Sequence, residues 1–542
     1  MFVRLPRALL WLLPCATLVL LLVAPVVRLA LEGWGLVGDT AGLNASAANT
    51  SAWHMGWQLW QDDYLRWRLV WSFAQAAITC VAALLLGLPV AWVLARFDFW
   101  GRLLVLRLLM LPFVVPTLVA ALGMLALWGP RGIVSGWLGI NLQDTPWLLL
   151  LGNLFFNLCL VVRAGVDALS QVSARRVDAA RSLGATPWRA FWRVEWPAIM
   201  PWLASSLCLV FLYCFAGFGL ALVLGGQRYA TIEVEIYTLV AHELKLAEAS
   251  ALALWMLLLT GTVAVAYAYI EKRLAAPSRP ESIALVRPAG LQWWAVLAAL
   301  AVLGVFCAAP LLAIVWRAVN AGTQVWALAV DVETLAALWN TLRFTAMALL
   351  AATVLGLCHA MAAQSSLLWR AAAFLPFVVS PITVAFGLLL LYPQWSASLW
   401  LLLAAYAVLA YPFVANSVAA GLDSLPKHLV YAARTLGASP MRTFWRVTLP
   451  LVGPALRRGM AFAAATALGE FAVTLFLSRP EWATLTTLIY QRLGRPGAIN
   501  MDVSLVLACF LMALALAAFY VIEWPNQAGK NTVSFLPSAH HA

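Results

Sequence analysis

Apolar runs long enough to cross a lipid bilayer recur along the whole chain of 542 residues. A helix needs about 20 apolar residues to cross roughly 30 Å of hydrocarbon. Twelve runs of this kind lie near residues 8–30, 69–95, 103–128, 146–166, 203–224, 249–270, 291–316, 338–362, 370–392, 396–420, 459–477 and 504–522. Because lipid offers the backbone no hydrogen-bonding partner, each run is expected to form a helix. The sequence therefore predicts an all-α integral membrane protein with about 12 transmembrane helices.

The first run follows Arg4 and Arg7, so it resembles a secretory signal peptide, in which basic residues precede an apolar stretch. It is longer than a typical signal core and lacks a clean cleavage site of small residues. We interpret it as a retained first span.

Composition and charge exclude several other classes of protein. Sixty-four per cent of the residues are hydrophobic and only 10% are charged, which is too little polar surface for a soluble domain of this length. Most of the 34 Lys and Arg fall between spans on one side when the N-terminus is placed in the cytosol, so we expect both termini there. The basic residues do not gather on one soluble face, which argues against nucleic-acid binding. All eight cysteines lie within the apolar runs without ligand spacing and are expected to be buried apolar residues.

The chain repeats itself. DAARSLGATPWRAFWRVEWP (Asp178–Pro197, the first loop) and YAARTLGASPMRTFWRVTLP (Tyr431–Pro450, the second loop) match without a gap at an offset of 253 residues. The Pro-containing segments Leu111–Gly123 and Leu375–Gly387 also match. We expect two tandem repeats of six spans each, residues 1–270 and 291–542, joined by a cytosolic linker at 271–290 that contains several prolines. Two copies of one orientation are related by an axis along the membrane normal, with the pathway between them.

Each loop is expected to form two short helices around a glycine turn. Gly184 can adopt positive φ and end the first helix, and Thr186 can cap the next helix ahead of Pro187. The second loop repeats this order with Gly437, Ser439 and Pro440. A basic loop with Trp and Arg can also lie against anionic headgroups. Two copies with the same internal spacing instead favour a rigid element that transmits motion.

Both loops resemble the "EAA" motif of ABC-importer permeases, which reads E-A-A, three residues, Gly, nine residues, then I-x-L-P. The positions that carry the resemblance are Asp178, Ala179, Ala180, Gly184 and Pro197, and Tyr431, Ala432, Ala433, Gly437 and Pro450. Asp and Tyr replace the leading Glu, Val replaces Ile, and Trp196 replaces Leu in the first loop. The resemblance implies the type I ABC-importer permease fold, in which these loops dock into a groove of an ATP-hydrolysing subunit.

The same resemblance implies the partners of the chain. No G-x-x-x-x-G-K-[ST] phosphate loop occurs in the sequence, so we expect no ATPase activity and no cofactor bound by this chain. ATP and Mg²⁺ would be bound by two copies of a separate ATPase subunit, and a periplasmic binding protein would deliver the cargo. The fused layout resembles permeases of thiamine importers and, next, of ferric-iron importers. An ion-coupled carrier of six plus six spans is the alternative of another class.

A few residues are candidates for the transport pathway. Glu470 lies within the eleventh apolar run, where a carboxylate is costly unless it faces water or a partner. A cationic cargo would suit it, with help from aromatic faces. The other candidates are Phe471 and, around the matching Gly217, Tyr213, Phe215 and Phe218. A structural role for Glu470 in packing remains the alternative. Acidic residues of the external segment 225–250, Glu233 and Glu235 among them, are expected to face the binding protein.

Overall fold

The computed structural model describes residues 7–33, 61–274, 285–364, 366–396 and 398–523. Ten residues of the predicted linker, 275–284, lie outside this part of the chain. Immediately after them, Val286 pairs with Phe97 in an isolated parallel bridge, which holds the chain against the end of the second span.

The first repeat consists of helices throughout its described residues. They are α1 (Arg7–Leu18), α2 (Ala24–Gly33), α4 (Asp63–Arg96), α5 (Arg102–Leu108), α6 (Leu111–Val114), α7 (Thr117–Trp128), α8 (Ile133–Leu138), α9 (Pro146–Ser170), α10 (Ala174–Ser182), α11 (Pro187–Ala190), α12 (Trp196–Phe215), α13 (Phe218–Leu224), α14 (Ile232–Ala241) and α15 (Leu246–Leu274).

The second repeat follows the same order. Its helices are α16 (Gln292–Leu303), α17 (Ala309–Val319), α18 (Thr323–Ala329), α19 (Val332–Ala363), α20 (Leu367–Ala372), α21 (Leu375–Val378), α22 (Pro381–Leu391), α23 (Leu399–Asp423), α24 (Lys427–Thr435), α25 (Pro440–Thr443), α26 (Leu449–Leu468), α27 (Ala472–Leu477), α28 (Leu485–Leu493) and α29 (Ala498–Glu523).

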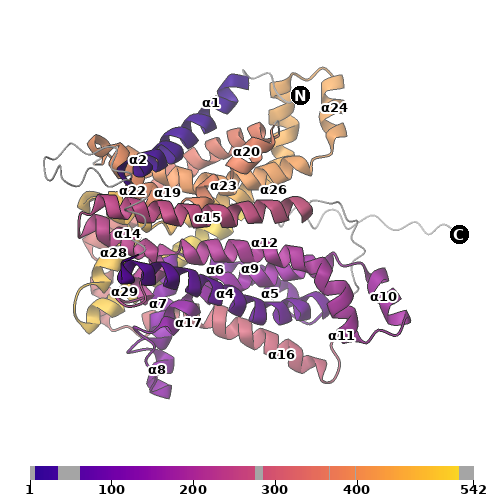
Figure 1. Ribbon diagram of the computed structural model, residues 1–542, viewed down its shortest axis with the longest axis horizontal. Helices are drawn as coiled ribbons and strands as arrows, with labels where there is room; N and C mark the ends of the chain where they lie inside the picture. The colour runs from indigo at the N-terminus through magenta and orange to yellow at the C-terminus, as the bar shows by residue number, and fades with distance from the viewer. Residues whose placement is uncertain (1–6, 34–60, 275–284, 365, 397, 524–542) are drawn as a thin grey trace.

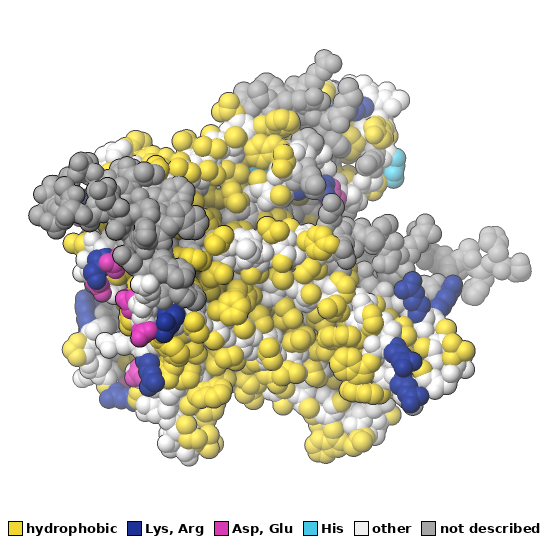
Figure 2. All heavy atoms as spheres, in the orientation of Figure 1, with side chains coloured by type: hydrophobic (Ala, Val, Ile, Leu, Met, Phe, Trp, Pro, Cys, Tyr) yellow, Lys and Arg dark blue, Asp and Glu magenta, His cyan; other side chains and the backbone are white. Residues whose placement is uncertain are grey.

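The long helices run side by side along one direction, which is horizontal in Figure 1. Helices α10, α11 and α24 lie at the right-hand end of the molecule, and α8, α14 and α28 lie at the left-hand end (Figure 1). Apolar side chains cover the middle of the face shown in Figure 2, whereas charged side chains gather at its two ends. This is the surface expected of a bundle that crosses a bilayer.

Ten helical segments of the described residues are long and apolar enough to cross a membrane, or eleven if one bent pair counts as a single span. This number is close to the twelve spans expected from the sequence. Four of the predicted runs are interrupted by a break between helices: 103–128, 203–224, 370–392 and 459–477. In 370–392 the two parts of the bent pair meet at 92°. In 459–477 α26 ends at Leu468 and α27 begins at Ala472, so the run is divided between two helices.

Proline and glycine explain these breaks. Pro116 and Pro381 force the preceding residues into extended backbone, with ψ of 132° at Val115 and 153° at Ser380. Each proline also removes a backbone N–H that a continuous helix would use. The other two breaks contain Gly217 and Gly469. Apolar length alone showed that these segments lie in the membrane, but it did not show that they are interrupted.

The first span of each repeat packs against the other repeat. Helices α1 and α2 contact α19 and α22, while α16 and α17 contact α4 and α7. A Cβ added at Gly387 would lie 2.8 Å from the Cβ of Pro25, and one added at Gly123 would lie 2.8 Å from the carbonyl oxygen of Pro310. Both crossings thus use a glycine where no side chain fits. The two repeats are interlocked, although they are separate in the sequence.

Candidate functional site

The two loops have the same backbone geometry. Gly184 and Gly437 have φ of 85° and 81°, a conformation that glycine adopts without steric cost. In the second loop the amide of Gly437 donates to the carbonyl of Arg434 at 2.9 Å, and the amide of Ala438 donates to the carbonyl of Ala433 at 3.0 Å. This pair of bonds is a Schellman motif, and the first loop repeats it at Gly184 and Ala185. The predicted glycine turn is confirmed in both copies.

Beyond the turn, each loop starts its second helix with the predicted cap. The hydroxyl of Thr186 accepts from the amide of Arg189 at 3.4 Å, and that of Ser439 accepts from the amide of Arg442 at 3.3 Å. A π-helical turn follows in each copy, Phe191–Glu195 and Phe444–Thr448. Each turn ends two residues before Pro197 or Pro450, whose missing N–H prevents the regular bond. The loops therefore join the following helices as fixed elements rather than as flexible connections.

Both loops expose large apolar side chains, alongside basic ones. Leu183 and Leu436, next to the glycine turns, are 89% and 88% exposed. The leading motif residues Asp178 and Tyr431 and the alanines Ala179 and Ala432 are exposed as well. Exposed apolar patches at a fixed geometry are typical of a surface that binds another protein.

The loops differ in how they are anchored. In the first, Glu195 lies buried in the π-helical turn and forms an ion pair with Arg96 at the end of α4, with 2.7 Å between Nη2 and Oε1. The equivalent residue of the second loop is the neutral Thr448. Asp423, before the second loop, instead pairs with Arg370 of α20 at 2.7 Å, whereas Asp167 pairs with Arg163 of its own helix. No hydrogen bond from either aspartate caps a loop helix among the described residues.

A cavity of about 280 Å³ lies between the repeats. The four interrupted spans line it at their breaks, which are α6/α7, α12/α13, α21/α22 and α26/α27. Interrupted membrane helices commonly form the substrate sites of transporters, because irregular backbone is tolerated where it borders a cavity. The four helix breaks, which the sequence did not predict, thus border a cavity between the repeats, where the pathway was expected.

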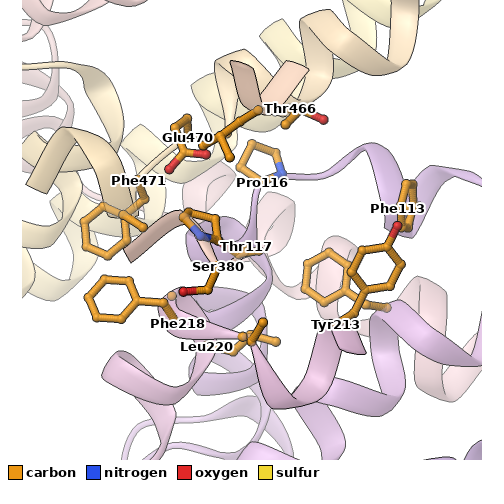
Figure 3. Close-up of a pocket in the computed structure, with 18 of the residues that line it drawn as sticks. Phe113, Pro116, Thr117, Tyr213, Phe218, Leu220, Ser380, Thr466, Glu470 and Phe471 are labelled. Carbon is orange, nitrogen blue, oxygen red and sulfur yellow. The ribbon is translucent and has the colours of Figure 1, made fainter. Parts of the chain in front are cut away.

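Five of the six pathway candidates line this cavity: Tyr213, Gly217, Phe218, Glu470 and Phe471. Phe218 and Phe471, which are equivalent in the repeat, stack on one another with ring centroids 5.9 Å apart. Phe113 and Tyr213 meet edge to face on the opposite side of the cavity (Figure 3). Phe215 does not line the cavity. It points the other way along α12 and stacks on Phe211, because neighbouring residues of a helix face different directions.

Glu470 lies in the break between α26 and α27 and points toward the cavity (Figure 3). Its Oε1 accepts a hydrogen bond from the amide of Val473 at 3.1 Å, so the carboxylate caps α27. Glu470 therefore has both the structural role and the position beside the pathway that the sequence suggested, since it fixes a helix end and also borders the cavity. It is the only charged side chain among the described residues that line the cavity.

Sequence analysis missed two groups of buried polar residues. Asn153 and Asn157 of α9 line the cavity, and their amides within an apolar run were the available signal. At the end of the bundle that carries α14, Glu235 pairs with Arg68, with 3.2 Å between Oε2 and Nε, and both side chains are about 5% exposed. Glu233 is fully buried. The expectation that Glu233 and Glu235 face a binding protein is wrong, because α14 folds back between the helices instead of forming an external loop.

The fold and the paired loops define a multi-pass membrane component of a transport system. The family described as "Binding-protein-dependent transport system inner membrane component" matches residues 83–276 and 352–524, one segment in each repeat. These segments cover more than half of the chain, and the chain belongs to this family. Members of the family are permeases, not enzymes, and they work in systems that depend on a binding protein.

Three relatives resemble the chain over most of its length, and each is named "Thiamine transport system permease protein ThiP". The Escherichia coli (strain K12) protein is 27% identical over 505 residues, which is 86% of this chain and 90% of the relative. The Salmonella typhimurium protein is 28% identical over 93% of this chain and 95% of the relative. The Haemophilus influenzae protein is 25% identical over 84% of this chain and 89% of the relative.

Proposed function

We propose that this chain is the transmembrane permease subunit of an ATP-driven importer that moves thiamine or its phosphates from a periplasmic binding protein to the cytosol. The observation that carries the proposal is the similarity to thiamine permeases, which extends over 84–93% of the chain and includes both repeats. The membrane is the bacterial inner membrane. The chain itself binds no cofactor, because ATP and Mg²⁺ belong to the partner subunit.

The two loops would each receive one copy of the ATPase subunit. Their exposed leucines offer apolar contact, and the glycine turns and π-helical turns hold each loop in a fixed relation to α12 or α26. Closure of the two ATPase copies would draw the loops together and open the pathway outward. ATP hydrolysis would return it inward. Residues 1–270 and 291–542 then act as the two repeats, with the linker between them in the cytosol.

The orientation follows from the same assignment. If the loops face the cytosol, then α1 begins on the cytosolic side, because its first turn lies toward the end that carries α24 (Figure 1). Basic side chains gather at that end in Figure 2, whereas acidic and basic side chains mix at the other. This distribution supports cytosolic termini.

The alternative cargo, ferric iron, has no specific observation in its favour. Iron ligation would require clustered oxygen or nitrogen ligands. No group of three or more His, Cys, Asp or Glu residues comes together in the described part of the chain. An ion-coupled carrier is not favoured either, because the family depends on a binding protein.

Reconstitution tests the proposal. The purified chain, its ATPase subunit and its binding protein are placed in liposomes, and uptake of radiolabelled thiamine is measured with and without ATP. We expect uptake only when all three proteins and ATP are present. Uptake by the chain alone, without ATP, would contradict the proposal and favour an ion-coupled carrier. Uptake of ferric iron but not thiamine would assign the other cargo.

A further inference from the structure

The cavity between the repeats is chemically asymmetric, although the backbone around it is repeated. Glu470 borders it in the second repeat, where the first repeat has Gly217. Asn157 borders it on α9 in the first repeat, where α23 of the second repeat has Ala410. The second repeat therefore contributes a carboxylate to the lining, and the first repeat contributes an amide.

The carboxylate is held in a fixed position, because its Oε1 accepts a hydrogen bond from the amide of Val473 at 3.1 Å. No Lys, Arg or His lies among the described residues of the lining, so no cationic side chain there neutralises Glu470. A positively charged ligand would supply the missing partner.

The side-chain oxygen of Asn157 also lacks a partner within the described structure. Its Nδ2 donates to the carbonyl oxygen of Asn153 at 2.8 Å and to Sγ of Cys214 at 3.2 Å, which fixes the side chain. Its Oδ1 is buried and has no hydrogen-bond partner within the described structure, and the residue is only 3% exposed. A buried acceptor without a donor is costly, and a ligand with an N–H group would satisfy it.

Aromatic rings also line the cavity. Phe218 and Phe471 lie to one side of Glu470, and Phe113 and Tyr213 lie farther along the cavity (Figure 3). Ring faces attract organic cations and stack on flat heterocycles. A volume of about 280 Å³ is close to the lower end of sites that enclose small molecules.

We infer that this cavity is a binding site of the permease itself. Its ligand is an organic cation with a positively charged ring at one end and an amino group at the other. Glu470 binds the cationic ring, and Oδ1 of Asn157 accepts from an amino group at the other end. The site selects cargo independently of the binding protein. The inference deepens the proposed function and rests on it in naming thiamine, which carries a thiazolium cation and an aminopyrimidine.

Binding to the purified full-length chain in lipid nanodiscs, without the binding protein or ATPase, tests the inference. The probes are thiamine and oxythiamine, which keeps the cation but has an oxo group in place of the amino group. We expect saturable thiamine binding. Glu470→Gln should weaken binding of both probes by about tenfold or more, because a close charge pair in a desolvated site is lost. Gln keeps an acceptor for the amide of Val473, so α27 stays capped.

Asn157→Ala installs the residue found at the equivalent position of the other repeat. We expect it to weaken thiamine binding several-fold and to leave oxythiamine binding unchanged. Glu248→Gln is the matched control, since it removes an exposed carboxylate outside the cavity, and it should change neither affinity. Equal losses for both probes in Asn157→Ala, or unchanged binding in Glu470→Gln, would overturn the inference.

The reconstituted importer separates this inference from the proposed function. If the complete system imports thiamine while the permease alone shows no saturable binding, the inference is wrong and the proposed function stands. If the complete system does not import thiamine, the proposed function is wrong whatever the permease binds.

Discussion

The first and second loops share their backbone conformation and differ in their charges. Both have a Schellman turn at a glycine, a capped short helix, a π-helical turn and a proline. Only the first is tied to a neighbouring span by a buried ion pair, between Glu195 and Arg96. The repeat therefore preserves the geometry that a partner must fit and leaves each copy free to be anchored differently.

The same contrast holds at the cavity. The helix breaks occur in both repeats, but the charged and amide groups do not. In the proposed mechanism, the pathway must be symmetric enough for two ATPase copies to move its halves and asymmetric enough to fit a cargo without symmetry. The loops supply the first property and the cavity lining supplies the second.

The largest expected effect comes from removing the shared geometry. Gly184→Val and Gly437→Val place a β-branched residue at positive φ, at a cost of about 1–2 kcal/mol each. We expect ATP-coupled uptake to fall about tenfold in each single variant, since a strain of that size changes a conformational equilibrium by about this factor, and to vanish in the double variant. Uptake in proteoliposomes and the amount of inserted protein measure the two effects separately.

Gly453→Val is the matched control for these variants. Gly453 lies within α26, has ordinary helical backbone and has open space where a side chain would extend. It should retain uptake. Asn at position 184 or 437, which tolerates positive φ better than Val, should restore part of the activity. Full activity in both valine variants would show that the turns do not transmit motion.

A smaller effect should distinguish how the first loop and the second loop are anchored to the neighbouring helices. Glu195→Ala leaves Arg96 without its partner in a mostly buried site, and we expect a loss of about 2 kcal/mol or more in stability. Thr448→Ala, the equivalent change in the second loop, removes no charge and should cost less. Apparent melting temperatures in nanodiscs, together with ATP hydrolysed per thiamine imported, compare the two. Similar losses in both variants would mean that the ion pair is not what distinguishes the loops.

The smallest effect concerns helices α14 and α28. Burial raises the pKa of Glu233 from 4.5 to about 8, an effect that the nearby hydroxyl of Ser380 only partly opposes. The folded state thus holds a proton that the unfolded state releases, so stability should fall as the pH rises from about 4.5 to about 8. Glu233→Gln should remove this loss and raise the melting temperature by about 2–4 °C at pH 8, but not at pH 4.5.

The equivalent residue in α28, Thr486, provides the comparison. Its hydroxyl donates to the backbone carbonyl of Glu470 and does not titrate near neutral pH. Thr486→Val should therefore lower the melting temperature by the same amount at every pH. A difference between wild type and Glu233→Gln that is constant with pH would contradict the assignment of a buried, protonated carboxyl group.

Much of the fold and of the loop geometry was predictable from sequence, because these features depend on local or repeated patterns. Apolar length identified the membrane segments, and Gly184, Thr186 and Pro187 specified a turn, a cap and a helix start in the order observed. The repeat then predicted the same structure for the second loop. The burial of Glu233 and the orientation of Phe215 away from the cavity were not predictable, since both depend on which distant helix lies alongside.

The sequence by itself determined that the chain lies in a membrane and that it is built twice from one unit. It also determined that each unit carries a loop with a defined turn geometry. These conclusions need only hydrophobic length, glycine and proline stereochemistry, and comparison of the chain with itself. The tertiary structure decided that the first spans are exchanged between the repeats and that four helix breaks meet around one cavity. It also decided that Glu470 and Asn157 border the same space. These arrangements join residues far apart in the chain, and packing between helices, rather than any local preference, determines them.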